Sequence, residues 1–107
     1  MLTTMVNNLK ATGIPLVEFK WRNAPEPPYM VWGADGTADT IHAEGKLSER
    51  AKTGTIDLYS AESMGTDYCN VEKALNMSGV AWSLNSVQYE DGAGLVHYEW
   101  TWETLDG

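Results

Sequence analysis

The residues from Val96 to Glu103 alternate strictly between large apolar and polar side chains. Val96, Tyr98, Trp100 and Trp102 share one parity, and the residues between them are polar. Because successive side chains of a β-strand point to opposite faces, this pattern predicts a strand with one face on a hydrophobic core. Three aromatic rings on one face of one strand need an apolar layer opposite them. The pattern therefore favours a sheet that packs against helices.

A second alternating run precedes this strand and predicts the other half of a β-hairpin. Val80, Trp82 and Leu84 share one parity, whereas Val87 and Tyr89 fall on the other. One added residue reverses the faces of a strand, so we expect a β-bulge at positions 85 and 86. The Asp-Gly-Ala-Gly sequence at 91–94 predicts the turn of the hairpin.

Two segments have helical periodicity. In residues 1–12 one apolar stripe is formed by Leu2, Met5, Val6 and Leu9. Gly13 suits a left-handed position just after this helix, and Pro15 prevents its continuation. A second helix is expected over residues 60–78, with Ser63 or Thr66 as its N-cap and Gly79 just beyond its end.

The residues between the helices predict three further strands. They are expected at 16–22, 29–34 and 50–59, with 41–47 as a continuation or a partner of the second. Asp35-Gly36 is a turn signal, and Gly54 within the third strand marks a bulge or a close backbone approach. Three of the four prolines lie at 25–28, which predicts an extended connection. The order α-β-β-β-α-β-β, with two helices on a mostly antiparallel sheet of four to five strands, predicts one α+β domain over residues 1–107.

The charge balance excludes several classes of partner. Seven Lys and Arg against fifteen Asp and Glu give a net charge of −8. A protein that grips nucleic-acid phosphates or anionic lipid needs clustered cations, so neither is expected as a binding partner. No apolar run approaches the roughly 20 residues of a membrane span, and no secretory signal is recognised. The single Cys69 excludes an internal disulfide, which fits synthesis in the cytoplasm.

Candidate catalytic and metal-binding residues are few. His42 with Glu44, and His97 with Glu99, each share the parity of one strand, but a zinc site needs three or four ligands. We therefore expect both histidines to be exposed strand residues and Cys69 to be a thiol on the flank or core side of its helix. No phosphate-binding loop or nucleophile motif occurs. The sequence predicts no enzyme, no cofactor and no metal site.

The aromatic residues are numerous for a chain of this size, with five Trp, five Tyr and one Phe. Trp100 and Trp102 are expected in the core. A domain this small has difficulty burying all five indoles, so one is expected at the surface or in a subunit interface. Trp32 is the candidate, because it lies beside the Asp35-Gly36 loop. The excess of acidic over basic side chains is interpreted either as a solvated face or as a surface that repels DNA.

The order of several short motifs resembles one family. They are LKATGIPL at 9–16, PPYMVW at 27–32, IDLYS at 56–60, VEKAL at 71–75 and HYEWTWE at 97–103. Together they resemble the tail terminator, or tail completion, proteins of long-tailed bacteriophages. The resemblance covers nearly the whole chain, and the chain departs from the family in its tryptophan content and in residues 33–40.

The resemblance implies a structural protein of the virion. Such proteins form a homo-oligomeric ring, commonly a hexamer, at the head-proximal end of the tail tube, where they end tube polymerisation and meet the head connector or stopper protein. DNA passes through the ring without specific binding. If residues 35–44 project as a hairpin loop, they contact the tube or line the lumen. The interface or lumen candidates are Trp32, Asp35, Asp39, His42 and Glu44.

Three alternatives remain open at the level of the sequence. The chain could be another head–tail joining or minor tail component. It could be an acidic adaptor or immunity-like module that masks a basic partner. The third alternative is a small enzyme that uses His42, His97 and Glu99.

Overall fold

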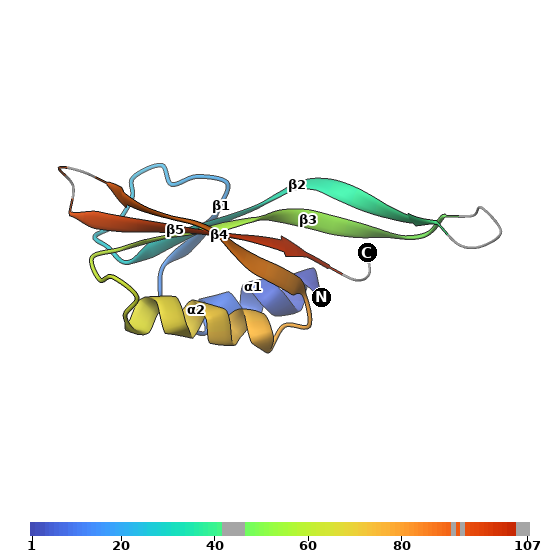
Figure 1. Cartoon of the computed structure of the whole chain (residues 1–107), viewed down its shortest axis with the longest axis horizontal. Coiled ribbons are helices and arrows are strands. Elements are labelled where there is room, and N and C mark those ends of the chain that lie inside the picture. Colours follow the sequence, from blue (N-terminus) through green and yellow to red (C-terminus); the bar gives the residue numbers. More distant parts are fainter. Residues whose placement is uncertain (42–46, 91, 93, 105–107) are drawn as a thin grey trace.

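A computed structural model gives a five-stranded sheet with two helices on one of its faces (Figure 1). It describes the backbone of residues 1–41, 47–90, 92 and 94–104, and their side chains except those of 37–41 and 47–50. The elements in chain order are α1 (Leu2–Lys10), β1 (Leu16–Glu18), β2 (Tyr29–Ile41), β3 (Leu47–Ser60), α2 (Thr66–Asn76), β4 (Ala81–Glu90) and β5 (Leu95–Glu103).

The strands lie in the order β1-β2-β3-β5-β4. Only β1 and β2 are parallel, and the other three neighbouring pairs are antiparallel. The last strand in the chain, β5, thus lies between β3 and β4 and pairs with both. This confirms the predicted α+β class and the order of its elements.

The core lies between the sheet and the two helices. On β5 every second residue is buried, as the alternation predicted, and Trp100 and Trp102 retain at most 2% of their accessible surface. The rest of the main cluster comes from α1, α2 and the inner face of β2 and β3, and includes Met5, Leu9, Met30, Ile56, Leu58, Val71 and Leu75. The Trp100 indole N–H donates to Glu72 Oε2 on α2 at 3.0 Å, which ties the helix layer to the sheet.

Several local predictions are confirmed. Gly13 and Gly79 follow the two helices with φ of 83° and 75°, a conformation that glycine adopts at little cost. The register of β4 with β5 shifts between Leu84 and Ser86, where the parity change predicted a bulge. A β-carbon at Gly54 would overlap the Gly33 carbonyl oxygen, so this glycine marks a close backbone approach.

The first strand is shorter than predicted. β1 ends at Glu18, because Phe19 adopts a φ of 70° that turns the chain out of the sheet. The Phe19 ring is 65% exposed, although its parity with Val17 suggested a buried face. The prediction of a strand through residue 22 was wrong, since period-two alternation also occurs in segments that no second strand pairs with.

The second helix starts six residues later than predicted, at Thr66. Ser60 still belongs to β3, and residues 61–65 form a loop. The buried Tyr98 hydroxyl holds this loop by accepting from the Met64 N–H and donating to the Glu62 carbonyl. Gly65 is the N-cap, and no side chain caps the helix, so the capping role expected of Ser63 or Thr66 was wrong. A tertiary contact to β5 decides this boundary, and the local sequence does not reveal it.

The Asp35-Gly36 pair does not form a turn. β2 continues through it to Ile41, and the register with β3 shifts between Ala34 and Gly36. Asp35 is therefore the extra residue of a β-bulge, a conformation that the same small and polar residues favour. β2 ends at Ile41, and β3 begins at Leu47 rather than at residue 50. The rest of the segment predicted at 41–47, residues 42–46, lies outside the described residues.

Candidate assembly surfaces

The most prominent surface feature is an arm formed by the ends of β2 and β3. The pairing of β3 with β5 ends at Thr53↔Glu103, whereas its pairing with β2 continues to Leu47↔Ile41. This two-stranded ribbon, residues 36–41 and 47–53, projects away from the sheet and helices and gives the molecule a long axis of 54 Å (Figure 1). A ribbon of two strands is only marginally stable by itself in water, so such an arm gains stability from a partner.

The root of the arm is held firmly by β5 and the residue after it. Lys52 and Thr104 exchange two hydrogen bonds: the Thr104 N–H donates to the Lys52 carbonyl at 2.8 Å, and the Lys52 N–H donates to the Thr104 hydroxyl at 2.9 Å. The Trp102 indole N–H donates to the Thr55 carbonyl at 3.1 Å. Thr104 and Trp102 are both buried. The direction of the arm is therefore set by the core.

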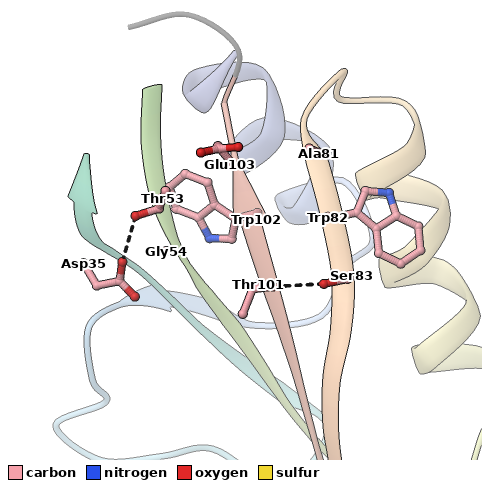
Figure 2. A pocket seen from close by; sticks show the side chains of 9 residues that line it. All are labelled: Asp35, Thr53, Gly54, Ala81, Trp82, Ser83, Thr101, Trp102 and Glu103. Atoms are coloured by element: carbon pink, nitrogen blue, oxygen red, sulfur yellow. Dashed lines mark hydrogen bonds between the residues drawn. The ribbon is translucent and has the colours of Figure 1, made fainter. Parts of the chain in front are cut away.

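A shallow hollow of about 380 Å³ lies beside this root, at the end of the sheet (Figure 2). The Asp35 carboxylate accepts from the Thr53 hydroxyl at 3.1 Å on one side of it, and Ser83 and Thr101 share a hydrogen bond of 3.1 Å on the other. The remaining residues that line it are Gly54, Ala81, Trp82, Trp102 and Glu103. Hydroxyls and carboxylates at an open sheet end suit contact with a polar protein surface.

Only some of the five interface or lumen candidates predicted from the sequence lie near one another in the structure. Trp32 is half-buried and packs against the core cluster, so it lies away from the tip of the arm. Asp35 is exposed at the root. Asp39 belongs to β2 within the arm. The side chain of Asp39, and His42 and Glu44 altogether, lie outside the described residues.

The face of the sheet opposite the helices carries a row of aromatic rings that crosses three strands. Tyr29 stacks on Tyr59 with ring centroids 5.0 Å apart, and Tyr59 stacks on His97 at 4.3 Å. The Trp21 ring meets Tyr29 edge-on at 6.4 Å. These residues come from the proline-rich connection, β2, β3 and β5. Sequence analysis missed the row because it depends on the register between strands far apart in the chain.

The row ends in an acidic cluster around His97. His97 Nε2 lies 2.7 Å from Asp57 Oδ1, and His97 Nδ1 lies 3.4 Å from Glu90 Oε1. The His97 side chain is 16% exposed, so the expectation of an exposed histidine was wrong. Burial raises the pKa of Asp57, an effect that the hydrogen bond and charge of His97 oppose and the nearby Glu99 reinforces. Burial and the Asp57 charge likewise raise the pKa of Tyr59.

Among the described residues, no group of three His, Cys, Asp or Glu is arranged to hold a metal ion. Cys69 is exposed on α2. Neither of the two described helices has the length and apolar character that crossing a bilayer requires. No known family model matches the sequence, and no curated protein matches it either.

Proposed function

We propose that this chain is a structural protein of a phage virion, the subunit of a ring at the head-proximal end of the tail tube. In this role the ring ends tube polymerisation and joins the tail to the head connector. The protein is made in the host cytoplasm and becomes part of the tail. It is proposed to bind copies of itself, the tube protein and the connector, and to let DNA pass without specific contacts.

The projecting arm is the observation that carries the assembly part of this proposal. Its strands extend beyond the last pair formed by β5, Thr53↔Glu103, and its direction is fixed by Trp102 and Thr104. An arm that leaves its own core and is only marginally stable by itself is suited to contact another molecule. The choice of assembly rests on the order of motifs that resembles the tail terminator family.

The charge of the chain supports the proposed passage of DNA. Each copy carries a net charge of −8, so a closed ring of such copies repels phosphates along its bore. Asp35 is exposed at the root of the arm, and Asp39 lies further along it. These residues are the proposed source of negative charge toward the lumen.

Polymerisation of the cognate tail tube tests the function directly. Purified chain is added to growing tubes, and the lengths and ends of the tubes are recorded by negative-stain imaging. We expect shorter tubes with a ring at one end, and a free ring with a mass near six times 11.8 kDa in light scattering. Tubes that grow to the same length with and without an excess of the chain would contradict the proposal.

The acidic cluster favours a second candidate, an adaptor that masks a basic protein. Asp57 and Glu90 contact one histidine at the end of the aromatic row, and Glu99 lies beside Asp57. Rings beside carboxylates suit Lys or Arg side chains. A tight one-to-one complex with a basic protein, abolished by Glu90→Lys with Glu99→Lys, supports this function. A ring on the tube end argues against it.

A further inference from the structure

β4 is an outer strand with little of the usual protection against pairing, apart from the bulge between Leu84 and Ser86. It is ten residues long, has no proline and carries one charged side chain, Glu90. Among the described residues no strand pairs with its outer side, since it is the last strand of the sheet. Folded proteins usually shield such an edge with lysine, proline or a covering loop, because a bare edge accepts a strand from another chain.

Two hydrogen bonds at the opposite side of the sheet fix which way the backbone groups point. The Met30 N–H donates to the Pro15 carbonyl at 2.7 Å, and the Phe19 N–H donates to the Trp32 carbonyl at 2.8 Å. The backbone groups of residues 30 and 32 therefore face β1, and those of 29, 31 and 33 face β3. In an antiparallel pair, the backbone N–H and carbonyl groups of two opposite residues either point toward each other or both point away from the partner strand.

This alternation can be followed across the registers to β4. On β3, the backbone N–H and carbonyl groups of residues 54, 56, 58 and 60 face β5. The backbone groups of their partners on β5, residues 102, 100, 98 and 96, therefore face β3. The β4 residues opposite these four then point their N–H and carbonyl groups away from the sheet. They are Trp82, Leu84, Val87 and Tyr89.

β2 presents a second unpaired edge along the arm. β1 ends at Glu18, opposite Trp32. Among the described residues no strand pairs with the side of β2 that faces away from β3 beyond the Phe19–Trp32 hydrogen bond. The bulge at Asp35 resets the alternation, so that Thr37 and Asp39 lie opposite β3 residues that face away from β2. The backbone groups of Thr37 and Asp39 thus face outward.

We infer that a second copy of the chain occupies these edges, with β2 of the arm of one copy pairing with β4 of the next. The two edges lie on opposite sides of one sheet, and their strands run in opposite directions within it. A neighbour displaced sideways therefore presents β2 antiparallel to β4. This contact joins two different patches, an arrangement that forms a ring when the rotation between neighbours closes.

The geometry also fits a closed sheet. The arm extends past the end of β4 at Ala81, so pairing the two edges shifts neighbours along the strands. A closed sheet accommodates such a shift by tilting its strands against the ring axis. The inference that the assembly is a ring rests on the proposed function. The inference that the two edges pair does not depend on that function.

Proline variants with matched alanine variants test the pairing. Tyr89→Pro removes one outward N–H of β4, and Thr37→Pro removes one from the arm, whereas neither N–H belongs to a ladder within the chain. Tyr89→Ala and Thr37→Ala keep the N–H and serve as controls; Tyr89 is 67% exposed, so losing its ring disturbs the core little. We expect each proline variant to raise the dissociation constant of self-association about tenfold or more over its alanine control, the effect of losing one to two hydrogen bonds. Sedimentation or light scattering over a concentration series measures this constant.

Amide hydrogen exchange on the unmodified chain provides a second test that needs no variant. The N–H groups of Val87, Tyr89, Thr37 and Asp39 exchange quickly in the dilute monomer and slowly in the assembled form if the edges pair. Unchanged exchange at these amides, equal association of proline and alanine variants, or a monomer at every concentration would each overturn the pairing.

The tube experiment separates this inference from the proposed function. If rings still cap tubes and the proline substitutions do not weaken self-association, the proposed function is supported and the edge pairing is overturned. Association that the proline substitutions weaken, in a protein that leaves tube growth unchanged, supports the edge pairing and contradicts the function.

Discussion

The indole of Trp102 lies directly over the backbone of Gly54. A β-carbon on residue 54 would stand 2.5 Å from Cζ2 of that indole and nearer still to the carbonyl oxygen of Gly33. β2, β3 and β5 meet at this point, just where the arm leaves the sheet. The absence of a side chain at residue 54 allows one of the two buried indoles of β5, that of Trp102, to reach the root of the arm.

Gly54→Ala is expected to destabilise the protein by about 1–3 kcal/mol, the usual effect of overfilling a packed core. Neither neighbour of the new methyl group gives way easily, because one is backbone and the other is a buried ring. Gly36→Ala is the matched control, since its β-carbon would meet only the Thr53 hydroxyl oxygen at 3.5 Å. Urea unfolding measures both variants, and equal free energies for the two would contradict the close approach.

Glu72→Ala is expected to cost about 1–3 kcal/mol of stability, because it leaves the buried Trp100 indole N–H without its acceptor. Glu72→Gln retains an acceptor oxygen and is expected to lose clearly less. Thermal unfolding followed by tryptophan fluorescence compares the two. Identical losses would show that the hydrogen bond to Trp100 contributes nothing beyond the rest of the side chain.

Asp57→Asn is expected to stabilise the protein at neutral pH. Since burial raises the pKa of Asp57 above its ordinary 3.8, the folded chain keeps this proton at pH values where the unfolded chain has lost it. The stabilisation is complete below 3.8 and is lost as the pH rises through the raised pKa. Asparagine removes the charge and still accepts the hydrogen bond from His97.

The unfolding free energies of the original chain and of Asp57→Asn, measured over a range of pH, test the predicted direction of this effect. The advantage of Asp57→Asn in unfolding free energy is expected to shrink as the pH falls and to vanish below 3.8. A difference that stays constant with pH would mean that Asp57 titrates alike in the folded and unfolded chains.

Charge reversal on the arm tests its proposed place at the lumen. Asp35→Lys with Asp39→Lys is expected to slow DNA ejection or to trap DNA in assembled particles, because lysines bind the passing phosphates. The control pair is Glu26→Lys with Glu62→Lys, which changes the net charge equally at exposed sites outside the arm. Equal ejection kinetics for the two double variants would contradict the proposed position of the arm at the lumen.

The elements that follow from local periodicity were predictable from the sequence. The burial of Tyr98 and Trp100, the bulge between Leu84 and Ser86 and the left-handed Gly13 each depend on a few neighbouring residues. They required no knowledge of the sheet order.

The features that depend on distant residues were not predictable in this way. His97 meets Asp57 only because β5 lies beside β3, and a residue's neighbours in the chain do not reveal that pairing. Asp35-Gly36 has the composition of a turn, but pairing with β3 on both sides of it holds the segment as a bulge. The arm and the two free edges follow from strand lengths and order, which the sequence pattern left undecided.

The position of β5 between β3 and β4 has a consequence for synthesis. A chain that has emerged from the ribosome only as far as β4 has no native partner for that strand, and β3 lacks its neighbour on one side. The sheet is completed only after β5 has been added as far as Glu103, so this order of strands delays folding until β5 has been synthesised. Nascent chains that lack β5 have two bare strand edges and no finished core, and these are the features that most favour aggregation.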